Sequence, residues 1–243
     1  MALVIFDLDG TLIDSKTDLV NSVNATRGEM GKAPIPEELV SSYIGNGAPV
    51  LIQRALGPEA TEAELKHALE FFLVHYRQHC VDSTVLYPAI GNSLQAMHEA
   101  GVALAVLTNK PVRISRLIME HLGVNNLMFQ IYGGNSFEFK KPNPMGIQAL
   151  RAESPADTAV TWMVGDTSVD IQTARNAGVS ACGVAWGFQP EAFLVDAPDL
   201  IIGQLSELAE VVIPRPRGPI AEGVREQFPT SVCADRDADP AAG

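Results

Sequence analysis

The chain has few cysteines, few cationic residues and no long apolar segment, and each shortage argues against a class of function. Its three cysteines among 243 residues are widely spaced and lack a CxxC pair, so neither a disulfide framework nor a zinc site is indicated. Lys and Arg total 17 against 29 Asp and Glu, a formal net charge of −12. This charge argues against nucleic acid or an anionic membrane surface as the main partner.

The same composition favours an ordinary globular protein. No apolar run approaches the roughly 20 residues of a membrane-spanning helix, and no basic leader precedes the first predicted strand. Hydrophobic residues make up 47% of the chain and charged residues 19%, as in most soluble domains. We therefore expect a soluble cytoplasmic protein with no membrane partner. Because the chain is acidic, an anionic substrate would need local cations, either a metal or a few placed lysines.

The N-terminal stretch places two carboxylates directly after a predicted strand. Leu3–Phe6 is an apolar run long enough for one buried strand, and Asp7, Asp9 and Gly10 follow it. Charge at the end of a buried strand is costly unless something pairs with it, and in an open parallel sheet this edge is where ligands bind. Carboxylate oxygens suit Mg²⁺. An Asp-rich turn explains Asp-x-Asp equally well, so this pattern alone leaves both interpretations open.

A helical region follows the first motif, and no strand is predicted within it. Helices are expected to begin at Ser15 and to cover residues 37–44, 48–56 and 62–79. The last of them carries apolar residues at helical spacing. We therefore predict a small helical domain, residues 15–82, inserted after the first strand.

Beyond this region short apolar runs alternate with helical segments. Strands are predicted at residues 102–107, 128–132, 159–164, 180–184 and 199–202, and helices at 112–122, 143–152, 169–177 and 205–213. Repeated βα units predict a parallel sheet with helices on both faces. The predicted fold is α/β, a doubly wound parallel sheet built from residues 1–14 and 83–213. Residues 214–243, dominated by Pro, Arg, Asp and Ala, predict a poorly ordered tail.

Polar residues follow three further predicted strands, as they do the first. They are Thr108 and Asn109, then Lys140 and Lys141 in the next loop, and finally Asp166 and Asp170. Because the carboxyl ends of parallel strands meet at one edge, we expect these side chains in one cleft. Each group alone is typical of a turn or a helix cap. Their recurrence after four strands favours a shared site.

The string from Asp7 to Ser15, DLDGTLIDS, together with these later motifs, resembles the haloacid dehalogenase superfamily of phosphatases and phosphomutases. The resemblance covers residues 3–213, with the sheet as the Rossmann-like core and the helical insert at the position of a C1-type cap. It implies that Asp7 is the nucleophile that forms an aspartyl phosphate and that Asp9 is the general acid and base. Dehalogenase relatives lack the second acid, so Asp9 favours phosphoryl hydrolysis or transfer.

The resemblance also implies roles for the later motifs. Thr108 and Asn109 would hydrogen-bond the phosphoryl oxygens, and Lys141 would neutralise developing charge. Lys140 is the alternative, because two adjacent lysines precede Pro142.

A Mg²⁺ cofactor is implied as well. It would be bound by Asp7, by Asp166 and by the main-chain carbonyl of Asp9, with Asp170 acting through water. Four carboxylates and a dianionic phosphate in one cleft would repel one another without a divalent cation and a lysine.

Three segments, residues 43–51, 79–88 and 107–111, resemble bacterial phosphoglycolate phosphatases in particular. The resemblance implies 2-phosphoglycolate as substrate, with its carboxylate near Gly45, Asn46 and Gly47. Arg54 is the nearest cation along the chain, but it lies two helical turns further on and is a weak candidate for binding the carboxylate. A plain interhelical turn is the alternative for this loop. Asn135 departs from the pattern, since many phosphoglycolate phosphatases have an acidic residue there.

Other functions remain open at this stage. A sugar-phosphate phosphatase or a β-phosphoglucomutase-like phosphotransferase would use the same core, because the cap chooses the substrate. A non-catalytic binding protein on this fold is least favoured, since every motif residue is present. We expect a small phosphorylated metabolite as partner and a monomer or homodimer as assembly. His75 and His79 are expected on a solvated helix face, not in a metal site.

Overall fold

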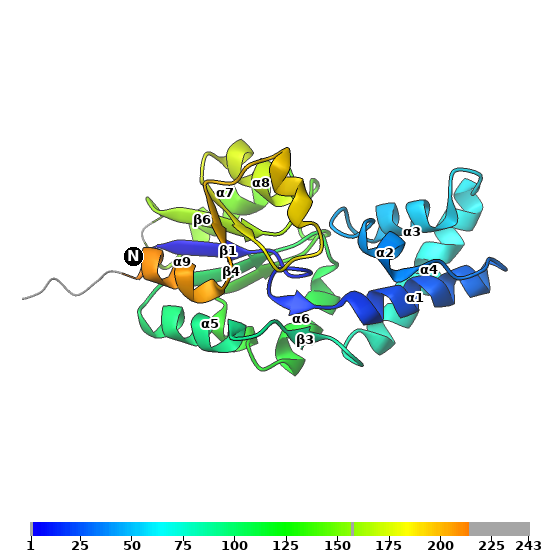
Figure 1. The fold of residues 1–243 in the computed structure, drawn as a ribbon, viewed down its shortest axis with the longest axis horizontal. Helices are drawn as coiled ribbons and strands as arrows, with labels where there is room; N and C mark the ends of the chain where they lie inside the picture. Colours follow the sequence, from blue (N-terminus) through cyan, green and yellow to red (C-terminus); the bar gives the residue numbers. More distant parts are fainter. Residues whose placement is uncertain (1, 157, 214–243) are drawn as a thin grey trace, which may run out of the picture.

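The computed structural model describes residues 2–156 and 158–213. They form a sheet flanked by helices and, beside it, a unit made of helices alone (Figure 1). The predicted tail, residues 214–243, lies outside the described residues. Among the helices that are described, none is both long and apolar enough to cross a membrane.

The sheet has six strands in the order β5-β4-β1-β6-β7-β8, and all its pairs are parallel. The strands are β1 (Leu3–Phe6), β4 (Ala103–Leu107), β5 (Gln130–Tyr132), β6 (Thr161–Gly165), β7 (Ser180–Val184) and β8 (Leu200–Ile202). The first strand lies in the middle, with Leu3 opposite both Ala103 and Thr161. The predicted doubly wound α/β fold is confirmed.

Helices cover both faces of this sheet. One face carries α5 (Ile90–Glu99), α6 (Val112–His121) and α9 (Leu205–Val212), and the other carries α7 (Met145–Glu153) and α8 (Ser168–Ala177). Short 3-10 turns lie at Asn125–Leu127 (η1) and Pro190–Leu194 (η2). Within β1, Val4 and Phe6 pack into one apolar cluster while Leu3 and Ile5 pack into the other. Both faces are buried, which is why the strand is apolar throughout instead of alternating.

The helical unit consists of α1 (Lys16–Glu29), α2 (Glu37–Ser41), α3 (Ala48–Leu56) and α4 (Glu62–His79). Helices α1 and α3 both pack against α4. A capping box starts α4, because Thr61 Oγ1 accepts from the Glu64 amide at 3.3 Å and the Glu64 carboxylate accepts from the Thr61 amide at 2.8 Å. Of the predicted bounds, α3 and α4 match, whereas α2 ends three residues earlier than expected.

The two connections between the units are tied together. Strand β2 (Ile13–Asp14) pairs antiparallel with β3 (Val85–Leu86), a ladder too short to leave a periodic signal in the sequence. Buried Asp18, in the first turn of α1, accepts from the amides of Ser83 at 3.0 Å and Thr84 at 2.9 Å and from the Thr84 hydroxyl at 2.7 Å. These contacts fix where the helical unit meets the sheet.

Candidate active site

Polar residues expected at the strand ends do meet at one edge of the sheet, and some of them line a pocket between this edge and the helical unit. The pocket has about 490 Å³ of empty space, part of it open to solvent. Its lining on the sheet side includes Asp7, Asp9, Thr108, Asn109 and Lys110, and on the helical side Gly45, Gly47, Phe72 and Tyr76. Residues far apart in the sequence therefore face one another across it.

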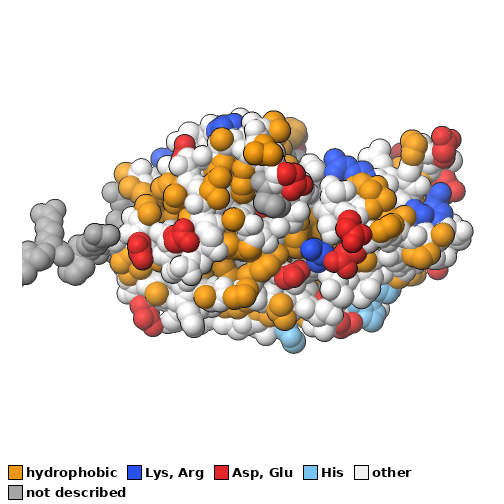
Figure 2. All heavy atoms as spheres, viewed as in Figure 1, with side chains coloured by type: hydrophobic (Ala, Val, Ile, Leu, Met, Phe, Trp, Pro, Cys, Tyr) orange, Lys and Arg blue, Asp and Glu red, His pale blue; other side chains and the backbone are white. Residues whose placement is uncertain are grey.

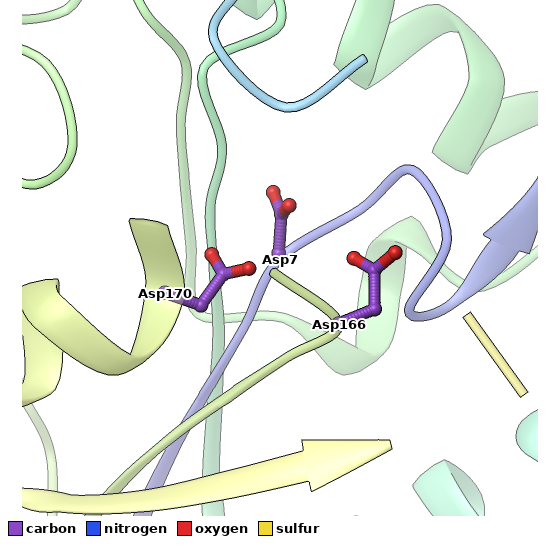
Figure 3. A group of neighbouring side chains, drawn as sticks. All are labelled: Asp7, Asp166 and Asp170. Carbon is purple, nitrogen blue, oxygen red and sulfur yellow. The ribbon is translucent and has the colours of Figure 1, made fainter. Parts of the chain in front are cut away.

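Three carboxylates gather at this edge. Asp7 follows β1, Asp166 follows β6 and Asp170 lies in the first turn of α8, and Figure 3 shows their carboxylates projecting into the same space. One oxygen from each lies within 4.8 Å of the others, and all three residues are buried. Only oxygen donors are present, which is the donor chemistry that Mg²⁺ prefers.

Lys141 is the cation of this cluster. Its Nζ lies 2.8 Å from Asp7 Oδ1 and 2.5 Å from Asp170 Oδ1. Lys141 therefore forms ion pairs with both Asp7 and Asp170. Lys140 points elsewhere and donates to the main-chain carbonyl of Asn46 at 2.5 Å. Of the two lysines left open by the sequence, the structure places Lys141 among the carboxylates.

The electrostatics of the cluster are unbalanced. Burial raises the pKa of Asp7 to about 6, with Asp170 adding to the rise and Lys141 opposing it. Burial also raises the pKa of Asp166 well above its usual range, and Asp170 and Asp7 add to that rise. Burial alone would lower the pKa of Lys141, but Asp170 and Asp7 outweigh it and raise the value. Three buried carboxylates thus share one ammonium, and a divalent cation would supply the positive charge that the cluster lacks.

Two glycines let the chain approach Asp166 closely. Gly10 has φ +78°, and a Cβ there would lie 2.7 Å from the Asp166 carboxyl carbon. A Cβ on Gly187 would likewise collide with the Asp166 side chain. The carboxylate is held by the amide of Phe188 at 2.8 Å and by the hydroxyl of Thr11 at 3.3 Å. The DGT of the first motif therefore supports a carboxylate that lies 156 positions away from Gly10 in the chain.

Asp9 has a different environment from Asp7. Its carboxylate accepts from Lys110 Nζ at 2.7 and 3.0 Å and from Ser15 Oγ at 2.5 Å. Lys110 Nζ also donates to the hydroxyl of Tyr76, on α4, at 2.5 Å. Sequence reasoning did not predict that Ser15 and Lys110 contact Asp9, or that Tyr76 contacts Lys110. Lys110 directly follows Thr108-Asn109, which was a usable signal, but Tyr76 lies on the buried stripe of its helix and looks like core.

Thr108 and Asn109 line the pocket, and Asn109 Nδ2 and Thr108 Oγ1 already have hydrogen-bond partners. Asn109 Nδ2 donates to the carbonyls of Gly45 at 3.0 Å and Lys141 at 3.2 Å, while its buried Oδ1 accepts no hydrogen bond from the described residues. Thr108 Oγ1 accepts from the Lys110 amide at 3.3 Å. Asn109 therefore joins the loop of the helical unit to the sheet edge.

The loop at residues 45–47 lies over the pocket in a conformation that glycine favours. Gly45 has φ +110° and Gly47 has φ +83°, and both line the pocket. Arg54, by contrast, is exposed and borders a separate hollow with Ser42 and Tyr43. Arg54, a weak candidate for the substrate carboxylate on sequence grounds, does not line the pocket, because two turns of α3 carry it away from the loop.

The remaining residues singled out in the sequence have structural partners. His75 Nδ1 lies 3.1 Å from Ser22 Oγ, and His79 Nδ1 lies 2.7 Å from Asp82 Oδ2. Neither belongs to a metal-binding group in the described part of the chain. Asn135 Oδ1 accepts from the Val112 amide at 3.0 Å, a contact that an acidic side chain could also make at the start of α6.

Comparison with known proteins identifies the class. A sequence model of the haloacid dehalogenase-like hydrolases matches residues 4–184, and the chain belongs to this family. Within it, the chain is similar to phosphoglycolate phosphatases. That of Vibrio parahaemolyticus is 37% identical over 217 residues, covering 86% of this chain and 95% of the relative. That of Agrobacterium fabrum is 36% identical over 209 residues, covering 85% and 90%.

Solved structures agree with this relationship. The crystal structure of a predicted phosphoglycolate phosphatase from Haemophilus somnus superposes with a TM-score of 0.80 at 32% sequence identity. The match covers 86% of this chain and 96% of that one. The similarity therefore extends over the sheet and the helical unit together.

Proposed function

We propose that this chain is a Mg²⁺-dependent cytoplasmic phosphatase that hydrolyses 2-phosphoglycolate to glycolate and phosphate. The observation that carries the proposal is Asp7, buried at the end of β1, 2.8 Å from Lys141 Nζ and clustered with Asp166 and Asp170. The phosphoglycolate phosphatases to which the chain is similar support the choice of substrate.

Asp7 and Asp9 divide the chemistry. A carboxylate oxygen of Asp7 attacks phosphorus, forming an aspartyl phosphate as the bond to the ester oxygen breaks. Asp9 gives a proton to that departing oxygen. It then takes a proton from the water that attacks the aspartyl phosphate, releasing phosphate and restoring Asp7. The pocket lining carries both carboxylates.

Three side chains at the sheet edge interact with the negatively charged phosphoryl group during transfer. Lys141, already paired with Asp7 and Asp170, neutralises the developing negative charge. Thr108 offers a hydroxyl to the phosphoryl oxygens. Asn109 donates to them only by giving up its contact with the Gly45 or the Lys141 carbonyl, so its binding role is linked to the position of these two segments.

The metal site uses the same cluster. Asp7, Asp166 and the main-chain carbonyl of Asp9 would hold Mg²⁺, with Asp170 acting through water. The ion supplies positive charge that offsets the excess of buried carboxylates and the substrate phosphate. Asp170 also fixes the start of α8, since its carboxylate accepts from the Thr167 amide at 3.1 Å and hydroxyl at 2.7 Å.

The helical unit serves as a cap. We assign residues 15–82 to this domain and residues 1–14 and 83–213 to the core, with Gly45, Asn46 and Gly47 as the cap loop that faces the substrate. Such a cap excludes water from the reacting group and limits the site to a small phosphorylated metabolite.

A panel of phosphomonoesters tests this proposal. With Mg²⁺ present, kcat/KM is expected to be highest for 2-phosphoglycolate, compared with glucose 6-phosphate, β-glucose 1-phosphate and p-nitrophenyl phosphate. A higher value for a sugar phosphate would refute the substrate assignment. Absence of turnover on every ester, in a protein that binds Mg²⁺, would refute the enzymatic mechanism itself.

A further inference from the structure

The two walls of the pocket differ in chemistry. Apolar side chains dominate the cap wall, namely Leu19, Ile44, Leu51, Phe72 and Leu73. The core wall carries the carboxylates of Asp7 and Asp9. Of the residues that line the pocket in the described part of the chain, Lys110 alone is cationic. A second anionic group on a substrate would therefore find one charged partner here.

Lys110 joins the two walls. Its Nζ contacts both oxygens of Asp9, at 2.7 and 3.0 Å, and the Tyr76 hydroxyl at 2.5 Å. It also lies 4.5 Å from the centroid of the Tyr76 ring. The lysine side chain is only 3% exposed, and a buried ammonium requires an anionic partner. Asp9 supplies that partner when no substrate is bound.

The shape of 2-phosphoglycolate brings its carboxylate to this lysine. One methylene separates the ester oxygen from the carboxylate. The ester oxygen must contact Asp9 to receive a proton, and Lys110 Nζ is already within 3.0 Å of both Asp9 oxygens. A carboxylate one carbon further on is therefore within reach of Lys110. Placed against the apolar cap wall instead, it would be buried without a partner, which is costly.

We propose that Lys110 and Tyr76 bind the substrate carboxylate and so select 2-phosphoglycolate over phosphomonoesters that lack an anion at this distance. The inference rests on the proposed function. Lys110 exchanges one of its two contacts with Asp9 for the carboxylate, and the Tyr76 hydroxyl donates to the same group. Because Tyr76 belongs to α4, the bound carboxylate also holds the cap against the sheet.

A matched substrate pair measures this selection. Ethyl phosphate has a methyl group where 2-phosphoglycolate has its carboxylate, so the ratio of their kcat/KM values reports on carboxylate binding. Lys110→Met is expected to lower that ratio at least ~30-fold, as the loss of a charged hydrogen-bond partner does. Lys110→Arg should retain more of it. Lys66→Met, at an exposed position of α4, is the control and should leave the ratio unchanged.

Binding gives a second readout without turnover. In 3-phosphonopropionate a methylene replaces the ester oxygen, and propylphosphonate lacks its carboxylate. In the presence of Mg²⁺, calorimetry on the wild type should show tighter binding of 3-phosphonopropionate. Lys110→Met should lose this preference, while circular dichroism checks that the variant is folded.

The outcomes separate the inference from the function on which it rests. A wild-type enzyme without preference for 2-phosphoglycolate would refute the proposed function. A wild-type preference that Lys110→Met keeps within about 3-fold would overturn the inference alone. Equal losses on both esters would also overturn it, because Lys110 would then serve Asp9. If Lys110→Met does not fold, Tyr76→Phe decides, and an unchanged ratio in that variant would overturn the inference.

Discussion

Asp7 and Asp9 are two residues apart, yet the protein surrounds them differently. Asp7 lies among carboxylates with Lys141 as its cation, whereas Asp9 is held by Lys110 and the hydroxyl of Ser15. Both side chains line the pocket, but Asp7 belongs to the buried carboxylate cluster while Asp9 does not. Environment, not residue type, therefore assigns the two roles.

Replacing the nucleophile separates chemistry from folding. Asp7→Asn is expected to lower kcat for p-nitrophenyl phosphate by at least ~10³-fold, as removal of a nucleophile does elsewhere. It removes one of three crowded, buried carboxyl groups, so the melting temperature of the metal-free protein should not fall. Asp196→Asn, which affects contacts with Arg175 at 3.1 Å and Gln172 at 3.0 Å away from the site, is the control. Residual activity above about a tenth of wild type would refute the covalent mechanism.

At the scale of elements, the boundaries set by local chemistry were predictable. The predicted β1, α3 and α4 match the structure, since a buried apolar run or a capping residue fixes each end. Strand β5 starts two residues later than predicted, at Gln130, because η1 occupies the residues just before Met128. The strands β2 and β3, with two residues each, depend on pairing between distant segments and leave no local signal.

The site was predictable to the same extent. Asp7, Asp166 and Lys141 follow strands, so topology alone brings them together at one edge. The contact of Lys110 with Tyr76 depends on how α4 lies over the sheet, and nothing in the local sequence determines that position. Asn109 shows the same limit, since its bond to the Gly45 carbonyl connects the sheet edge to the helical unit.

The Asp18 contacts at the junction are expected to support the whole helical unit. Asp18→Ala leaves the Ser83 amide and the buried Thr84 amide and hydroxyl without their acceptor, so we expect a loss of about 2–4 kcal/mol in the free energy of unfolding. Glu62→Ala is the matched control, because Glu62 is an exposed acidic residue in the first turn of α4. Urea titration measures both. Equal, small effects would show that the junction needs no such support.

The cap loop gives a second test at this scale. In Gly47→Val a Cβ would lie 2.9 Å from the Asn109 carbonyl and 3.3 Å from Lys140 Nζ, so the loop cannot approach the sheet edge. We expect kcat/KM for 2-phosphoglycolate to fall at least ~10-fold, about 1.4 kcal/mol, and that for p-nitrophenyl phosphate to fall much less.

Gly57→Val is the control for backbone strain. Gly57 has φ +87°, close to the φ +83° of Gly47, but a Cβ there meets nothing within 4 Å. It should therefore reproduce the cost of a positive φ and leave substrate preference intact. Equal losses on both esters in Gly47→Val would mean that the loop supports folding or catalysis in general.

The whole molecule carries a net charge of −12, whereas the proposed reaction needs positive charge at the carboxylate cluster. On the face shown in Figure 2, Lys and Arg side chains are scattered among Asp and Glu over both domains. One apolar cluster runs from the sheet into the cap, through Leu8, Leu12, Leu19 and Phe72. The cluster of carboxylates lies beside this shared core, where water screens charge least.

Metal removal should therefore affect both activity and stability. EDTA is expected to abolish turnover and Mg²⁺ to restore it, while Ca²⁺ should inhibit because its looser coordination misplaces the reacting groups. Mg²⁺ should also raise the melting temperature of the chelated protein, since it binds only the folded state. Asp166→Asn should weaken this rise. Full activity after exhaustive chelation would contradict the metal assignment.

The cap loop is held through its main chain. Three consecutive carbonyls, those of Ile44, Gly45 and Asn46, accept hydrogen bonds from Gln189 at 2.9 Å, Asn109 at 3.0 Å and Lys140 at 2.5 Å. Every amino acid has such a carbonyl. Mutations can therefore change the side chains at positions 44 and 46, and with them the surface offered to a substrate, without removing the acceptors that hold the domains together. During evolution, substrate specificity can therefore change at this loop while the main-chain hydrogen bonds that hold it are kept.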